Sequence, residues 1–200
     1  MTRVIFLHGV GANGATFNPL IEMLKLDEFN VEVFNPDAPY PYDMSAYGRQ
    51  WFSISGVTEE NRTDRVNQAL TKFKQVLESY GPLEDTILVG FSQGSIMSLH
   101  AAAAGFPVKG VIAIAGRLSA PVAHRDEWPA ITLIHDQDDP VIAIEKAQET
   151  YHWLEEAGAK PQAFVSKDVG HSIGSSMIPV IRKEIEKLLY VVVNKNWPQF

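Results

Sequence analysis

Short, almost continuously apolar runs alternate with longer amphipathic segments through most of this 200-residue chain. The short runs have the length of strands and lack polar alternation, which is typical of parallel strands buried on both faces. This alternation predicts an α/β fold, with a doubly wound, mostly parallel sheet and helices on both of its faces, in one domain over residues 1–200. Strands are expected at residues 4–7, 31–34, 87–91, 111–115, 131–134 and 163–165.

The longer segments repeat apolar residues every three or four positions, as helices do when they cover one face of a sheet. This spacing predicts helices over residues 66–80, 141–154 and 178–192. Residues 93–104 form a further predicted helix whose small side chains allow it to lie close to the sheet.

One segment, residues 35–58, has three prolines and no clear period. A long irregular segment in a compact domain is often functional. One interpretation is that its large side chains form a wall of an acyl or alcohol pocket. The other is that they cover an edge of the sheet. The candidate pocket residues are Tyr40, Tyr42, Met44, Tyr47 and Trp51.

Composition narrows the possible partners. The 17 basic and 24 acidic residues give a net charge of −7, which disfavours binding to nucleic acid or to an anionic membrane surface. The chain has no cysteine, which excludes disulfides, thiolate metal sites and a cysteine nucleophile. It has no apolar run near the ~18 residues of a membrane span and no secretory start, so we expect a cytoplasmic protein without stable membrane insertion. No metal or cofactor site is expected.

The most informative motif follows the expected strand at residues 87–91 and opens the small-residue helix. It has the pattern G-x-S-x-G and reads Gly90-Phe91-Ser92-Gln93-Gly94. The pattern places a serine on a sharp strand-to-helix turn, where larger residues two positions away would clash. Ser92 is therefore the candidate nucleophile. The Gln93 N–H lies at a helix N-terminus, where it can stabilise an oxyanion.

Candidate partners for this serine follow two later strands. Asp138 and Asp139 come after the strand at residues 131–134, and His171 comes after the strand at residues 163–165. The chain order Ser, Asp, His is that of α/β-hydrolases. His171 would accept the Ser92 proton, and one of the two aspartates would orient the imidazole.

Four segments together resemble the carboxylesterase/lysophospholipase family of α/β-hydrolases, which includes the acyl-protein thioesterases: His8-Gly9-Val10-Gly11, residues 90–94, Asp139-Pro140-Val141 and Gly170-His171-Ser172. The resemblance implies an α/β-hydrolase fold with little or no lid. It implies Ser92, Asp139 and His171 as a catalytic triad and the backbone N–H groups of Val10 and Gln93 as the oxyanion hole. Trp51 matches a recurrent tryptophan, whereas Asp136 stands where the family usually has glycine. The implied activity is hydrolysis of small-molecule carboxylic esters or thioesters, with acyl group and leaving group undetermined.

Two other functions are compatible with parts of the sequence. Gly9, Gly11 and Gly14 form a G-x-G-x-x-G pattern after a strand, which is typical of dinucleotide-binding oxidoreductases, with Asp37 as the ribose-binding candidate. The Pro- and Tyr-rich segment that follows does not fit that fold. The third possibility is a binding module on an inactive hydrolase fold, and nothing in the sequence supports loss of the triad.

Overall fold

The computed structural model describes residues 1–190, which alternate between strands and helices as the sequence predicts. The strands are β1 (Thr2–Leu7), β2 (Val31–Phe34), β3 (Tyr40–Pro41), β4 (Arg49–Gln50), β5 (Thr86–Phe91), β6 (Gly110–Ile114), β7 (Ala130–Asp136) and β8 (Gln162–Ser166). The α-helices are α1 (Asn18–Leu24), α2 (Glu59–Glu78), α3 (Gln93–Ala103), α4 (Ile144–Glu156) and α5 (Ile178–Tyr190). Short 3-10 helices cover Gly14–Phe17, Leu26–Glu28 and Leu83–Asp85.

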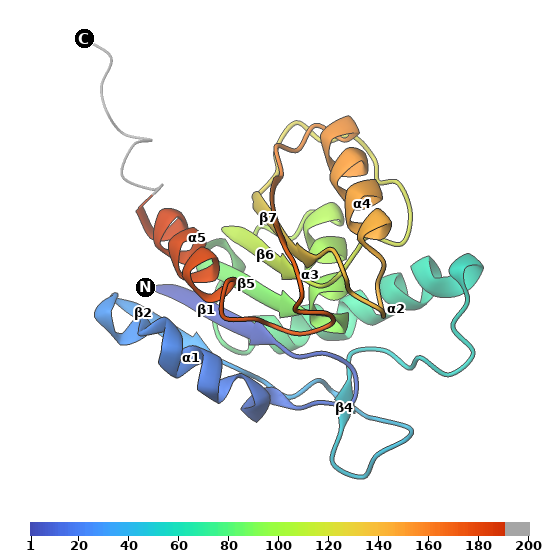
Figure 1. The fold of residues 1–200 in the computed structure, drawn as a ribbon, viewed down its shortest axis with the longest axis horizontal. Coiled ribbons are helices and arrows are strands. Elements are labelled where there is room, and N and C mark those ends of the chain that lie inside the picture. Colours follow the sequence, from blue (N-terminus) through green and yellow to red (C-terminus); the bar gives the residue numbers. More distant parts are fainter. Residues whose placement is uncertain (191–200) are drawn as a thin grey trace.

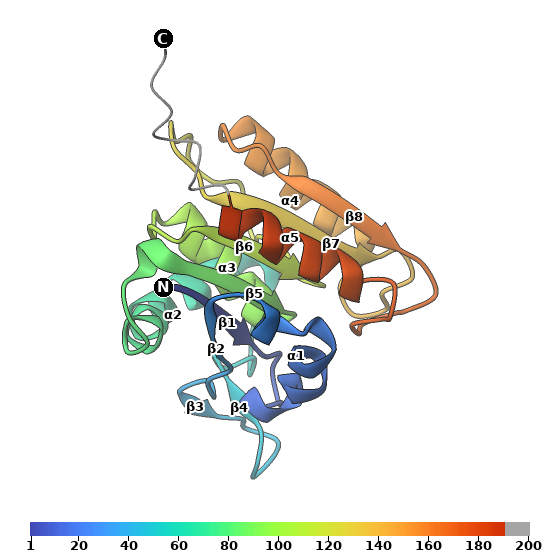
Figure 2. The same cartoon turned by 90° about the vertical axis from the view of Figure 1, so that its left-hand side faces the viewer.

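Six of the strands form one parallel sheet in the order β2-β1-β5-β6-β7-β8. Helices α1 and α5 cover one face, and α2, α3 and α4 cover the other (Figures 1 and 2). The sheet is therefore doubly wound, which confirms the predicted architecture. The expected helix end at Val192 lies outside the described residues.

Side-chain alternation along the strands explains the two layers. In β1, Ile5 and Leu7 pack into the core beneath α2 and α3, whereas Val4 and Phe6 pack into the core beneath α1 and α5. Successive side chains of a strand point to opposite faces, so a strand with two apolar faces needs helices on both sides. No helix within residues 1–190 is long and apolar enough to cross a membrane.

The irregular segment contains more structure than its sequence indicates. Strands β3 and β4 pair antiparallel, with Tyr40 opposite Gln50. This small hairpin projects from the edge of the main sheet at which β1 ends (Figure 2). The Gly11 amide donates to the Arg49 carbonyl at 2.9 Å, and this bond ties the hairpin to the turn after β1.

A buried histidine, His100, lies in α3, on the face of the sheet that α2, α3 and α4 cover. His100 is 5% exposed, and its Nε2 accepts a hydrogen bond from the Ser119 amide at 3.2 Å. Burial, together with the nearby Arg117 guanidinium, lowers the pKa of His100 to about 4. The folded protein therefore holds this imidazole neutral well below the pH at which an exposed histidine would gain a proton.

We expect His100 to make the protein less stable in mild acid. The unfolded chain binds a proton on this imidazole near pH 6.5, whereas the folded chain does so only near pH 4, so stability falls as the pH decreases between these values. The free energy of unfolding should fall by about 2 kcal/mol between pH 7.5 and 5 from this group. Urea unfolding at both pH values measures the loss. It should be smaller in His100→Gln, and an equal loss in the variant would contradict the assignment.

Candidate active site

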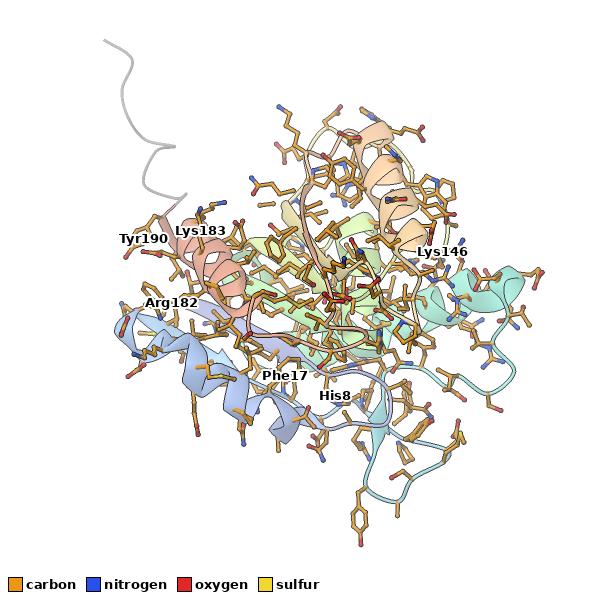
Figure 3. All side chains as sticks on the ribbon, in the orientation of Figure 1. His8, Phe17, Lys146, Arg182, Lys183 and Tyr190 are labelled. Atoms are coloured by element: carbon orange, nitrogen blue, oxygen red, sulfur yellow. The ribbon has the colours of Figure 1, made fainter. Side chains whose placement is uncertain are left out.

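The candidate residues gather at the carboxyl edge of the sheet. Val10 follows β1, Ser92 follows β5, Asp139 follows β7 and His171 follows β8. Parallel strands end at the same edge, so four segments far apart in sequence meet there. Figure 3 labels His8, the residue directly after β1, at this edge.

Ser92 lies on a strained turn between β5 and α3. Its φ of 51° and ψ of −114° place a non-glycine residue in a conformation that side chains rarely adopt. Two backbone hydrogen bonds hold the turn, from the Ser92 amide to the Ile114 carbonyl at 2.9 Å and from the Ile96 amide to the Ser92 carbonyl at 3.0 Å. The strained turn therefore presents the Ser92 side chain at the start of α3.

The two glycines of the motif allow this turn to pack. A Cβ at Gly90 would lie 2.5 Å from the Gly94 carbonyl oxygen, and a Cβ at Gly94 would lie 2.0 Å from the Leu7 carbonyl oxygen. Both distances are far shorter than a normal van der Waals contact. A side chain at Gly90 would collide with the start of α3, and one at Gly94 would collide with the end of β1, as the G-x-S-x-G pattern predicts.

His171 bridges the serine and a carboxylate. Its Nε2 lies 2.9 Å from Ser92 Oγ, and its Nδ1 lies 2.8 Å from Asp139 Oδ2. An ionised carboxylate only accepts hydrogen bonds, so Nδ1 carries a proton and Nε2 is free to accept the serine hydroxyl. The Phe91 ring packs against the imidazole at 5.1 Å between centroids, which restricts its orientation.

Asp139 is the aspartate that faces the imidazole. Its side chain has no exposed surface, and its Oδ1 accepts the Val141 and Ile142 amides at 2.8 and 3.0 Å. Burial opposes ionisation of Asp139, but the hydrogen bonds from His171 and these two amides outweigh it and lower the pKa of the carboxyl. Asp138 is exposed instead, and its Oδ2 accepts the Asp168 amide at 3.1 Å.

Asp136 holds the loops that carry these residues, a role that the sequence did not reveal. Its fully buried carboxylate accepts hydrogen bonds from the Asp138, Val169 and Gly170 amides and from Ser166 Oγ, at 2.7 to 3.2 Å. Burial opposes ionisation, yet these four bonds lower the pKa of Asp136. One carboxylate thus ties the loop after β7 to the loop that contains His171. The sequence signal for this role was that Asp136 departs from the glycine expected there from the family resemblance.

We expect Asp136→Asn to loosen the site without removing any residue of the candidate triad. The asparagine side chain keeps one oxygen acceptor and replaces the other oxygen with an NH₂ group, which cannot accept a hydrogen bond. At least one buried donor therefore loses its acceptor, and another donor faces the NH₂ group. The free energy of unfolding should fall by about 2 to 4 kcal/mol. Misplacement of His171 should lower kcat by about 10- to 100-fold with little change in KM. Asp168→Asn is the matched surface control, and an equal kcat for the two variants would contradict this role.

His8 supports the turn that carries Val10. The imidazole is buried; its Nε2 accepts the Ala38 amide at 3.0 Å, so Nδ1 bears the proton and donates to the Gly9 carbonyl at 2.7 Å. Burial lowers the pKa of His8, which favours this neutral form. The Trp51 indole N–H donates to the His8 carbonyl at 2.9 Å. Hydrogen bonds therefore fix the carbonyl groups of both residues that directly precede Val10.

The Gln93 side chain has a structural role in addition to its backbone position. Its Oε1 accepts the Trp51 amide at 2.7 Å, and its Nε2 donates to the Phe52 carbonyl at 2.8 Å. These bonds fasten the aromatic segment to the start of α3. As the first residue of α3, Gln93 also has an amide without a carbonyl acceptor within the helix, which is the property that an oxyanion donor needs.

The structure does not bring the five expected pocket residues to the cavities beside Ser92, and this corrects the expectation of an aromatic wall there. Trp51 is 1% exposed and packs edge-on against Phe73 in the core. The other four belong to the projecting hairpin and its connection: the Tyr42 ring lies against Gly11, and Met44 and Tyr47 are 80% and 87% exposed. Tyr40 lines a separate depression with Arg65. The hairpin projects from the edge of the sheet (Figure 2), and none of these four residues lines either cavity beside Ser92.

Two cavities flank Ser92. The first, of about 520 Å³, lies between α1, the loop after β8 and the start of α5, and its lining includes His171 and the apolar residues Phe17, Leu20, Met23, Ile173 and Ile178. The second, of about 500 Å³, lies between the turn after Ser92, the start of α2 and the loop before α4. Val10 and Val141 line both cavities. An extended substrate can therefore pass over Ser92 with one end in each.

Residues 2–189 match the family model described as phospholipase/carboxylesterase. The chain belongs to this family. It is therefore a hydrolase of carboxylic esters, and the resemblance inferred from the four short segments is confirmed. The match covers nearly all of the described residues, including both cavities and the Ser92 turn.

Individual relatives agree with this assignment. The chain is 34% identical over 184 residues to esterase YpfH of Escherichia coli K12, covering 85% of this chain and 75% of that protein. It is 22% identical to carboxylesterase SOBER1 of Arabidopsis thaliana, covering 94% and 91% of the two chains. Among solved structures, esterase PE8 superposes with a TM-score of 0.80 at 27% identity, over 94% of this chain and 92% of that one. The α/β-hydrolase fold is thereby confirmed.

The glycine pattern after β1 belongs to this hydrolase turn. The Gly14 amide donates to Asp37 Oδ1 at 2.8 Å, so the aspartate considered for ribose binding is bonded to the turn itself. A Cβ at Gly14 would lie 1.8 Å from the Asn35 carbonyl oxygen. The third glycine thus packs against the chain's own backbone, and the pattern has a structural explanation without a nucleotide.

Proposed function

We propose that the protein hydrolyses esters through an acyl-enzyme intermediate, with Ser92 as nucleophile, His171 as general base and acid, and Asp139 as the residue that orients His171. One observation carries the proposal: a single imidazole lies 2.9 Å from the serine hydroxyl and 2.8 Å from a buried carboxylate. A weak alcohol nucleophile needs this arrangement to lose its proton as it attacks.

The proposed reaction has two halves. Ser92 Oγ attacks the ester carbonyl while its proton passes to His171 Nε2, and the resulting oxyanion accepts hydrogen bonds from the Val10 and Gln93 amides. His171 then gives the proton to the departing alcohol or thiol, which leaves an acyl group on Ser92. Water repeats the sequence on the acyl-enzyme, with His171 again taking and returning a proton. Asp139 stabilises the positive imidazole in both halves.

The position of His171 supports a proposed role for each of the two cavities. The group that protonates the leaving atom must lie next to it, and His171 lines the apolar cavity beside α1 and α5. The alcohol or thiol therefore occupies this apolar cavity. The acyl group occupies the second cavity, which Ser92 and Gln93 line but His171 does not. This assignment predicts that enlarging Leu20 or Ile173 affects leaving-group choice more than acyl-group choice.

A fluorophosphonate probe tests the nucleophile directly. It reacts covalently with an activated serine, so we expect one label per chain, located at Ser92 by peptide mass spectrometry. An inactive binding module would give no label. A nucleotide-dependent oxidoreductase would also give none, and NAD would raise its melting temperature. Labelling at a different serine would contradict the proposed site.

A further inference from the structure

The proposed acyl cavity combines apolar and cationic side chains. Ser92, Gln93 and Ile96 contribute the side formed by α3 and its preceding turn. Further apolar lining comes from Val10, Phe52, Val141 and Ile142, and the charged lining consists of Glu59, Arg62, Arg117 and Lys146. Three cations and one carboxylate thus meet in one cavity of a protein whose overall charge is −7. A cavity built for an uncharged alkyl chain alone would not need them.

Two arginines share the single carboxylate. Arg117 makes two hydrogen bonds to Glu59, at 2.9 and 2.6 Å, and Arg62 makes a third at 3.2 Å. The hydrogen bond from Arg117 foremost lowers the pKa of Glu59 to about 2, so the carboxylate is ionised at neutral pH. It balances one of the two guanidinium groups. The other guanidinium charge is not balanced by Glu59 and is available to a bound anionic group.

Arg62 is the arginine with unused hydrogen-bonding capacity. Its Nε is buried and has no hydrogen-bond partner within residues 1–190. Arg117 already makes a bidentate ion pair with Glu59, and its side chain is 8% exposed. Arg62 makes one side-chain hydrogen bond among the described residues, to Glu59, and its side chain is 22% exposed, so its guanidinium has further N–H donors for an incoming anion.

Lys146 supplies a third cation from a different element. It lies in the first turn of α4, labelled in Figure 3, and lines the same cavity as Glu59 and Arg62 at the start of α2. Its partner is Glu149, three residues along the helix, at 2.8 Å. Both side chains are about 40% exposed, so this ion pair is weak and Lys146 can turn toward a bound anion.

We propose that this cavity selects acyl groups that end in a carboxylate, as in half esters of dicarboxylic acids. The apolar lining contacts the methylene chain, and Arg62 and Lys146 bind the terminal carboxylate while Arg117 remains paired with Glu59. The inference rests on the proposed function, because that function assigns the acyl group to this cavity. A site that binds a charged group disfavours neutral analogues strongly, because its own charges then stay unpaired.

The test compares two esters that differ only at the far end of the acyl group, monohexyl adipate and the hexyl ester of adipamic acid. The first ends in a carboxylate and the second in a carboxamide of nearly the same size. We expect kcat/KM to be at least about tenfold higher for the carboxylate. Raising the ionic strength should reduce this ratio, because salt screens the attraction.

Charge-removing variants locate the effect. Arg62→Gln and Lys146→Gln should each lower the ratio of the two kcat/KM values, and the double variant should bring it close to one. Lys72→Gln removes the same charge from the exposed side of α2, outside the cavity, and should leave the ratio unchanged. Equal rates for the two esters in the wild type, or a ratio that survives in the double variant, would overturn the proposal.

A binding measurement separates this inference from the proposed catalytic mechanism. In Ser92→Ala, calorimetry should show tighter binding of monohexyl adipate than of the carboxamide ester, and Arg62→Gln together with Lys146→Gln in that background should abolish the difference. This result supports the carboxylate site even if hydrolysis follows another route. Equal binding of the two esters rejects the site, even if fluorophosphonate labelling shows that Ser92 is the nucleophile.

Discussion

Replacing Ser92 with alanine should lower kcat for ester hydrolysis by about 10⁴- to 10⁶-fold. In the proposed mechanism the Ser92 hydroxyl oxygen forms the acyl-enzyme, and its removal leaves only substrate binding and the proposed oxyanion donors. The Ser92 side chain is small, and its hydrogen bond is to His171, so its loss should leave the fold intact. Alanine also retains the Cβ and thus the geometry of the strained turn.

The measurement is steady-state hydrolysis of a hexanoate ester at saturating substrate, together with the melting temperature of each protein. Ser95→Ala is the matched control, because Ser95 is a buried serine three residues further along α3. We expect the control to retain activity within about tenfold. Near wild-type turnover in Ser92→Ala would show that another group attacks the ester.

Asp139→Asn should lower kcat by up to about 10⁴-fold. An amide cannot stabilise the positive imidazole, and its NH₂ group can donate to His171 Nδ1 and so stabilise the tautomer that is unable to accept the serine proton. The oxygen of the amide can still accept the Val141 and Ile142 amides, so the loop after β7 keeps its local bonds. The loss should therefore appear in kcat rather than in folding.

Asp138→Asn is the control for this variant, because it makes the same chemical change at the adjacent position. Asp138 is exposed and accepts only the Asp168 amide among the described residues, a bond that an asparagine oxygen can also accept. Its effect on kcat should be less than about tenfold. The reverse order of the two variants would show that Asp138 orients the base.

Much of the architecture is visible in the chain because it follows from local patterns. The strand of residues 87–91 is apolar throughout, and the observed β5 spans Thr86–Phe91. The helix predicted over residues 66–80 shows the correct period but begins earlier, at Glu59, because Thr58 caps it and charged residues fill its first turn. Hydrophobic periodicity reports the buried face of an element, whereas its exposed ends carry little of that signal.

The turn at Ser92 is also encoded locally, since Gly90 and Gly94 are required by contacts within a few residues of the motif and with the adjacent β1. The order of the candidate residues along the chain, combined with a parallel sheet, is sufficient to bring them to one edge. Their catalytic roles remain predictions, with the variants above as their test.

Contacts between distant loops decide what the sequence pattern left open. The choice between Asp138 and Asp139 depends on which carboxylate the His171 loop meets, 32 residues further along the chain. The role of Asp136 depends on the same meeting of two loops, and the aromatic hairpin turns out to point outward. The paired charges of Glu59 and Arg117 join positions 58 residues apart. Side-chain direction in loops is set by packing against remote segments, and no period or short motif records it.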